Sequence, residues 1–143
     1  MPNYIAQSDL DVYSSDAVLV QLTDDAKAGT IDTSKVNECI VAAESEVDSY
    51  LSPRYSVPIT GTVPETVKEW AVQLTTLRLH QRRLPVPVDI TELGDEARRQ
   101  LKLVNDGTIT LNIGTDPPDE PSGRAAEFTF NKRKFSRTTM RDF

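Results

Sequence analysis

Hydrophobic positions that recur every three or four residues predict that the first 107 residues form a helical body. The clearest stretch is TSKVNECIVAAESEVDSYL, in which the apolar residues lie on one face of a 3.6-residue period. Asp32 or Thr33 can cap its amino terminus. The predicted helices cover residues 8–23 (one broken or two short, capped by Ser8 or Asp9 and by Ser15 or Asp16), 33–51, 64–83 and about 89–106.

After the last predicted helix the period changes from helical spacing to alternation. In TITLNI, residues 108–113, the apolar side chains Ile109, Leu111 and Ile113 fall on one side, as in a half-buried β-strand. Residues 126–131 alternate in the same way, so we expect a strand that can pair with them as a hairpin.

The expected fold is therefore mainly α: a four-helix body with a short β-strand or hairpin and an extended C-terminal arm. Between strand and arm, TDPPDEPSG contains three prolines and three acids, a composition that favours an extended, solvated linker. At about 3.1 Å per residue it could span roughly 28 Å. The predicted segments are the helical body 1–107, the strand 108–114, the linker 115–123 and the arm 124–143.

Charge divides the chain into an acidic part and a basic part. The 143 residues carry a formal net charge of −6, but residues 1–123 hold ten cationic and twenty acidic side chains, a net of −10. The arm has a side-chain net of +4 and contains all four phenylalanines. Such a dipolar chain is suited to head-to-tail contact with copies of itself or with an acidic neighbour.

The aromatic, basic arm is the strongest candidate for an interaction site. Ordering twenty residues costs on the order of 20–40 kcal/mol of backbone entropy, while full burial of one Phe returns roughly 1.5–3 kcal/mol. The arm therefore also needs main-chain hydrogen bonds, which strand addition to a partner would supply. The expected anchors are Phe128, Phe130, Arg133, Phe135, Arg137, Met140, Arg141 and Phe143.

Two alternatives for the arm stay open. It can fold back on its own body as the hairpin of 108–113 with 126–131, although a lone two-stranded hairpin is marginal in water. Its cations, with Phe135 among them, can instead bind nucleic acid through phosphate contacts and base stacking, so a nucleic-acid-binding module is the alternative function. The acidic body, which repels a polyanion, disfavours that role. A small regulator with a tail-borne binding motif is a third hypothesis.

Candidate chemistry elsewhere in the chain is weak, and we expect no enzyme, no metal site and no cofactor. The single cysteine, Cys39, excludes a disulfide framework, and His80 is the only histidine. The segment from Asp24 to Lys35 resembles a calcium loop, but it has too few oxygen ligands and ends in a lysine. We interpret it as a bend that needs Gly29 for its backbone and Ile31 for packing. No apolar run approaches the roughly 18 residues of a membrane span.

Four segments together resemble one known family. QLTDDAKAGTID, EVDSYLSPRYSVPI followed by Pro64, RLHQRR and the closing RKFSRTTMRDF are similar, in that order, to the small head–tail connectors of Mu-like tailed phages and prophages. The resemblance covers nearly the whole chain. None of the four segments is a catalytic motif.

This resemblance implies a structural protein of the virion neck that assembles in the host cytoplasm. Its subunits would form a homo-oligomeric ring, typically a dodecamer, that docks on the portal protein and continues the DNA channel toward the tail. The implied partners are the portal protein, neighbouring copies, a downstream neck or tail-terminator protein, and channel DNA without sequence specificity. Arg54 and Tyr55 would shape the Pro-rich turn, either by packing within it or as a second interface.

Overall fold

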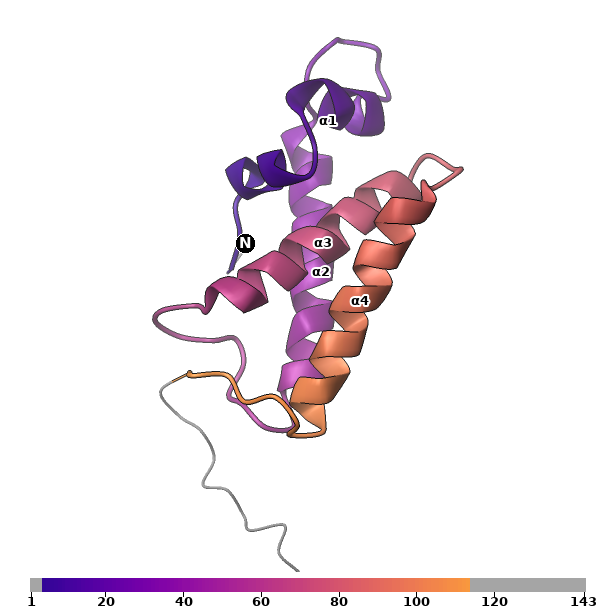
Figure 1. The fold of residues 1–143 in the computed structure, drawn as a ribbon. Helices are drawn as coiled ribbons and strands as arrows, with labels where there is room; N and C mark the ends of the chain where they lie inside the picture. Colours follow the sequence, from indigo (N-terminus) through magenta and orange to yellow (C-terminus); the bar gives the residue numbers. More distant parts are fainter. Residues whose placement is uncertain (1–3, 114–143) are drawn as a thin grey trace, which may run out of the picture.

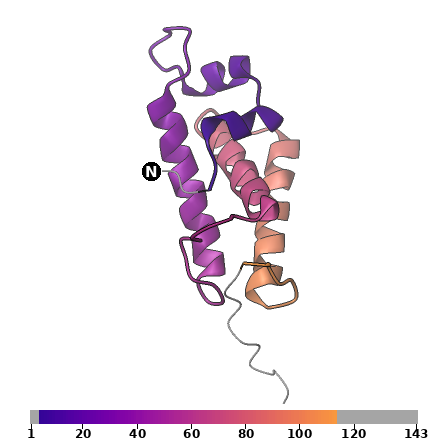
Figure 2. The same cartoon turned by 90° about the vertical axis from the view of Figure 1, so that its left-hand side faces the viewer.

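The structure, a computed structural model, describes residues 4–113 and confirms a mainly helical fold. Three long helices pack against one another, and two short helices lie across one end of them (Figures 1 and 2). The predicted segment 8–23 forms two short helices rather than one. The elements are the 3-10 helix η1 (Gln7–Val12) and the α-helices α1 (Asp16–Thr23), α2 (Thr33–Leu51), α3 (Glu65–Gln81) and α4 (Val88–Asn105).

The helix boundaries follow the local chemistry of the chain. The Asp32 carboxylate accepts hydrogen bonds from the backbone amides of Ser34 and Lys35 and so caps α2, as the sequence predicts. Pro64 and Pro87 stand immediately before α3 and α4, where their fixed φ suits a helix start. The end of α3 at Gln81 lies before the predicted residue 83.

The expected cap of the first short helix is wrong in detail. Ala6, not Ser8 or Asp9, occupies the N-cap position of η1, and the Asp9 carboxylate reaches back to the Ala6 amide at 2.7 Å. Ser15 does stand at the N-cap of α1, but its side chain makes no capping hydrogen bond. In η1, Asp9 therefore accepts the hydrogen bond of the N-cap amide from within the first turn and does not itself occupy the N-cap position.

The core lies where α2, α3 and α4 face one another. Helix α4 contributes its small and aliphatic positions, and α3 is buried on most of its surface. At Gly94 the two helices come so close that a Cβ would lie 2.4 Å from Cδ2 of the buried Leu77. The largest fully buried side chains are Leu10, Leu19, Ile40, Leu51, Leu74, Leu77, Leu79, Leu101, Glu44, Val36, Val47 and Val67.

The amino-terminal segment is tied to α2 by two carboxylates one turn apart. Buried Glu44 accepts hydrogen bonds from the backbone amides of Tyr4 (2.7 Å) and Ile5 (3.1 Å). The Tyr4 hydroxyl donates to Asp48 and accepts from the Ile59 amide at 3.0 Å. Burial and the hydrogen bond to Asp48 raise the pKa of Tyr4, which stays protonated as this donor requires. One tyrosine therefore joins the amino terminus, α2 and the α2–α3 connection.

The strand predicted for 108–113 is wrong. No β-strand occurs within the described residues 4–113, and the possible hairpin partner 126–131 lies outside them. The predicted sidedness is nevertheless present, because Ile109 is half-buried while Leu111 and Ile113 are buried. This segment returns from α4 toward the α2–α3 connection as irregular chain (Figure 1). The alternation reports one-sided burial against the body, without strand pairing.

Candidate interaction surface

The segment that leads to the arm is fastened to the body by Tyr55. This tyrosine is 4% exposed, and its hydroxyl accepts a hydrogen bond from the Leu111 amide at 2.9 Å. Leu111 and Ile113 pack into the same core cluster. Because the last described residue is anchored in this way, the chain leaves the body beside the α2–α3 connection.

Arg54 lies against the turn that ends α4. Gly107 adopts φ +79°, and a Cβ at this position would lie 2.2 Å from Nη1 of Arg54. The Arg54 Nε is buried and has no hydrogen-bond partner within residues 4–113. Arg54 and Tyr55 thus contact the segment after α4 from the α2–α3 connection. A second interface formed by them stays a prediction.

The opposite end of the molecule is held by charge. The Asp25 carboxylate pairs with Lys35, with Arg82 at 3.0 Å and with Arg83 at 2.8 Å. The hydrogen bond from Lys35, supported by Arg82, lowers the pKa of Asp25 to about 2. This carboxylate joins the connection between α1 and α2 to the end of α3.

The calcium-like segment has the bend that its sequence predicts. Gly29 adopts φ +73°, and Ile31 packs against the core. The Asp24 carboxylate accepts hydrogen bonds from the amides of Ala28 (2.9 Å) and Gly29 (2.6 Å), which lower its pKa. Within residues 4–113, no group of three or more His, Cys, Asp or Glu side chains is arranged to hold a metal ion. The carboxylates of Asp24, Asp25 and Asp32 in this segment are used in contacts with backbone amides and cations of the body.

Glu46 of α2 joins the two other long helices. Its carboxylate accepts from Arg78 of α3 and Arg98 of α4, each at 2.7 Å. Burial would raise the pKa of Glu46, but these two guanidinium groups outweigh burial and lower it. Through Glu46, Arg98 fixes one edge of α4 to α2, and Arg78 does the same for α3.

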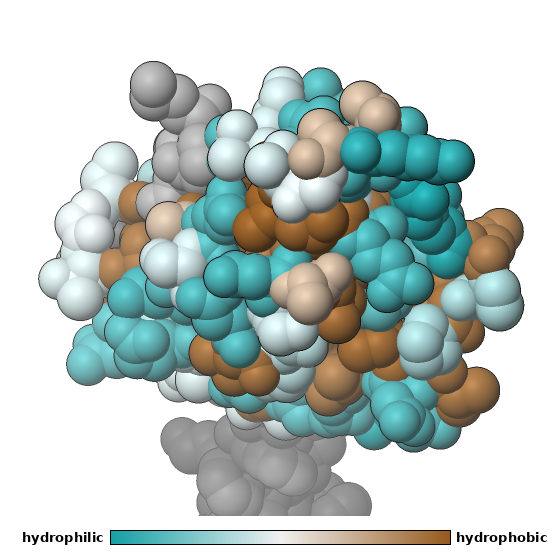
Figure 3. Space-filling view, turned by 90° about the horizontal axis from the view of Figure 1, so that it is seen from above, coloured by the Kyte–Doolittle hydropathy of each residue, from teal (hydrophilic) through white to brown (hydrophobic). Residues whose placement is uncertain are grey.

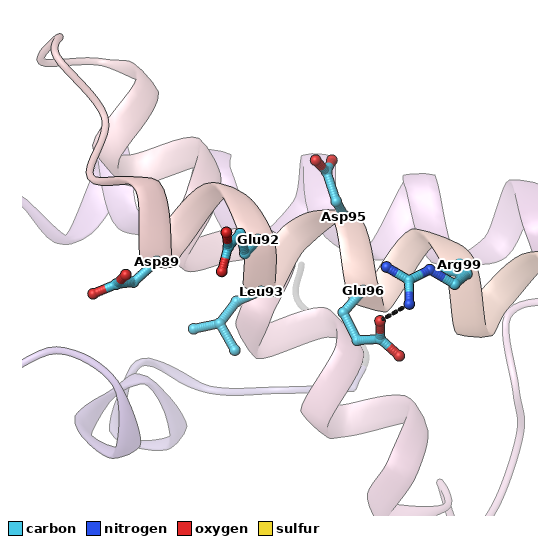
Figure 4. A pocket seen from close by; sticks show the side chains of 6 residues that line it. All are labelled: Asp89, Glu92, Leu93, Asp95, Glu96 and Arg99. Atoms are coloured by element: carbon cyan, nitrogen blue, oxygen red, sulfur yellow. Dashed lines mark ion pairs between the residues drawn. The ribbon is translucent and has the colours of Figure 1, made fainter.

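The outer face of α4 carries a hollow of about 760 Å³ with acidic walls. Asp89, Glu92, Leu93 and Glu96 project to one side of the helix, and Asp95 projects to the other (Figure 4). Glu96 pairs with Arg99 at 2.6 Å. We call this surface the α4 outer face; its residues are Asp89, Glu92, Leu93, Asp95, Glu96 and Arg99.

An exposed apolar tip adjoins the amino-terminal end of this face. Leu84 is 78% exposed and Val88 is 70% exposed. Viewed from above, hydrophobic residues protrude at the edge where the α3–α4 connection lies (Figure 3). We call Leu84 and Val88 the apolar tip.

The two side chains considered for chemistry are packed in the helical body. Cys39 is half-buried, and burial raises the pKa of its thiol. Burial likewise lowers the pKa of His80, which favours the neutral imidazole. Neither shift moves the side chain toward nucleophilic or cationic chemistry. Within residues 4–113, no helix has the length and hydropathy to cross a bilayer.

The predicted arm anchors all lie outside the described residues, so their roles stay predictions. The α4 outer face, in contrast, is not among the surfaces predicted from the sequence. The spacing of Asp89, Glu92 and Glu96 by three and four residues could have revealed it, since this spacing places acids on one helix face.

These features define a small, mainly helical protein with an acidic face on α4. Comparison with known protein families matches residues 4–130 to the family described as Bacteriophage Mu, Gp36. The chain belongs to this family and is a protein of Mu-like phages. A comparison with curated proteins finds no match.

Proposed function

We propose that this protein is a structural connector of the virion neck, which forms a ring on the portal protein and continues the DNA channel toward the tail. Membership of the bacteriophage Mu Gp36 family supports a phage role. The observation that carries the proposal is the anchored segment 109–113, because it fixes the place where the chain that leads to the basic, aromatic arm leaves the acidic helical body. In this role the protein performs no catalytic step.

The physical argument for a ring is the division of charge and aromatic surface. A heterologous contact between identical subunits uses two different patches, and it closes into a ring when the rotation allows. Here one patch is acidic and belongs to the body, while the other is basic and belongs to the arm. Phenylalanine and arginine, which are both enriched in protein–protein interfaces relative to the rest of the surface, are concentrated in the arm.

The test compares the full chain with a chain that lacks residues 124–143, each supplied to particle-producing cells without the native copy. We expect the full chain to co-purify with particles and with the portal protein. The truncated chain should remain helical by circular dichroism but be absent from particles. Incorporation of the truncated chain at the level of the full chain would refute the role of the arm.

Binding to nucleic acid through the arm is the competing function, and a salt titration separates the two. If the arm contacts mainly phosphates, its affinity for DNA should fall steeply with ionic strength, because bound counterions are released. Apolar docking on a protein should weaken much less. Strong, salt-sensitive DNA binding together with no association with the portal protein would favour the nucleic-acid-binding module.

A further inference from the structure

We propose that the apolar tip of one copy inserts into a hollow between η1 and α3 of a neighbouring copy. The inference rests on the proposed function, which supplies the neighbouring copy, and it adds a contact between two helical bodies. Both surfaces lie within residues 4–113.

The hollow lies between η1 and the first half of α3 and has a volume of about 300 Å³. This volume is at the small end of the range for protein binding pockets, so it suits one or two side chains rather than a folded segment. Val12 is 76% exposed and gives one wall an accessible aliphatic surface. The lining residues are Asp9, Val12, Tyr13, Glu65, Lys68, Glu69 and Val72.

The hollow carries a formal charge of −2, because three carboxylates and one ammonium group line it. Lys68 pairs with Glu65 at 2.7 Å. The other two carboxylates accept hydrogen bonds from neutral donors: Asp9 from the Ala6 amide, and Glu69 from the Tyr13 hydroxyl at 3.4 Å. Neutral donors leave the charge in place, so the occupant should combine aliphatic side chains with a cation.

The α3–α4 connection has this combination. Leu84 and Val88 are the two most exposed aliphatic side chains there, and Arg83 directly precedes Leu84. Within residues 4–113, the contacts of the Arg83 guanidinium with Asp24 and Asp25 all use Nη2. Its Nε and Nη1 donors therefore remain for a carboxylate of another molecule.

Charge also selects the orientation of the tip in the hollow. Arg83 lies on the α3 side of the tip, whereas Asp89 follows it in the first turn of α4. Asp89 projects to the same side of α4 as Glu92 (Figure 4). The favoured orientation directs Arg83 toward Asp9 and Glu69 of the neighbour and keeps Asp89 away from them.

A subunit cannot place its own tip in its own hollow. The hollow is centred on the first turns of α3, and the tip follows the other end of that helix (Figures 1 and 2). From Lys68 to Gln81 the helix axis measures roughly 20 Å at about 1.5 Å per residue. The tip and the hollow are thus two different patches at opposite ends of α3, as a heterologous contact between identical subunits requires.

The contact is expected to be weak between two free copies. A tip of two aliphatic side chains covers far less than the roughly 1,200–2,000 Å² of a stable complex. Two bodies of net negative charge also repel one another, although this repulsion is screened beyond about 8 Å at physiological ionic strength. Copies held side by side on the portal protein would form it at a high effective concentration.

The test uses two differently tagged full-length copies, both with Cys39→Ser, produced together in particle-forming cells. One copy carries Asp89→Cys, next to the apolar tip, and the other carries Asp11→Cys, next to Val12. Both acids are exposed, and neither belongs to the tip or lines the hollow. We expect a short bismaleimide to link the two tags. The matched control moves the second cysteine to Asp106→Cys, an exposed acid at the end of α4, and should give little product.

Each outcome decides the proposal. A two-tag product that exceeds the Asp106 control supports the contact. Equal yields from both positions, no product, or a link from the Asp89→Cys copy to the portal protein instead would overturn it. Normal recovery of the chain in purified particles without the two-tag link rejects this contact and leaves the connector role intact. Absence of the tagged, otherwise unchanged chain from particles rejects the connector role, and this contact with it.

Substitutions in the tip test its apolar part on the same cross-link. Leu84→Asp should lower the yield about tenfold, because the aliphatic side chain is no longer buried in the hollow. Leu84→Met keeps an apolar side chain of similar size and should retain the yield. Equal yields from Leu84→Asp and Leu84→Met would contradict insertion of the tip.

Charge reversal tests the ionic part. Arg83→Glu should lower the yield, and combining it with Glu69→Arg in the other copy should restore it. The control is Arg99→Glu on α4, a cation whose side chain is 69% exposed, and it should leave the yield unchanged. Equal losses from Arg83→Glu and Arg99→Glu, or no restoration by Glu69→Arg, would refute the assigned orientation.

Discussion

The two ends of this helical body are held together by different forces. At one end, Asp25 gathers three cations, and all four side chains are partly exposed. At the other, buried Tyr55 holds the segment after α4 through its ring and hydroxyl. Exposed ion pairs contribute little and are screened by salt, whereas buried aromatic surface contributes several times more. The end that holds the segment after α4 is therefore the more firmly held.

The largest expected effect comes from removing the Tyr55 ring. Tyr55→Ala should lower the free energy of unfolding by about 3–5 kcal/mol, as for other buried aromatic residues. Tyr55→Phe keeps the ring but leaves the Leu111 amide without its acceptor, so we expect a loss of about 1–3 kcal/mol. Urea denaturation followed by circular dichroism measures both. Equal losses would mean that the hydroxyl, rather than the ring, secures this end.

Glycines with similar backbone angles at the two ends allow a matched comparison. Gly29 has φ +73°, and a Cβ added there would have nothing within 4 Å, whereas at Gly107 (φ +79°) a Cβ would meet Arg54. Alanine at either position should cost about 1–2 kcal/mol for its left-handed backbone. Gly107→Ala should cost more because the Arg54 guanidinium must also move. Thermal unfolding of each variant provides the measurement.

A double variant separates the cost of the contact with Arg54 from the cost of the left-handed backbone at residue 107. If the excess cost at Gly107 comes from Arg54, adding Arg54→Ala should remove it and bring Gly107→Ala to the level of Gly29→Ala. An excess that persists in the double variant would show that the turn itself, and not the guanidinium, resists the change.

The smallest effect is expected at the charged end. Asp25 has a folded-state pKa of about 2, below its ordinary 3.8. Because the folded state favours the ionised form, its contribution to stability is present above about pH 4 and is lost as the pH falls toward 2. Asp25→Asn should flatten the pH dependence of the melting temperature in that interval. An unchanged slope between wild type and variant would contradict the assigned ion pairs.

The spacing of apolar residues predicted the long helices, because the apolar residues on one face of each helix are buried in the core. Val36, Ile40 and Val47 are buried on one face of α2 as their spacing indicates. It failed for 108–113, since alternation shows which side is buried but not whether another strand supplies hydrogen bonds. Instead, the Leu111 amide is satisfied by the hydroxyl of Tyr55, a residue 56 positions away in the chain.

The candidate surfaces were predicted less well than the fold. The arm is a prediction from composition that lies outside the described residues, whereas the acidic outer face of α4 depends on which acids remain unpaired after folding. Asp25 and Glu92 look equivalent in the sequence, yet one is surrounded by cations and the other is not. Only the tertiary structure reveals that difference, because the partners of Asp25 come from α2 and the end of α3.

The absence of a side chain at Gly94 also affects where α4 lies and which way its surface acids point. Leu77 fills the space next to Gly94, so a bulkier residue at this position would force either the Leu77 side chain or α4 itself to shift. A shift of α4 would change the direction of the acids on its outer face. The lack of a side chain at buried Gly94 thus helps to set the direction in which the acids of α4 point at the surface.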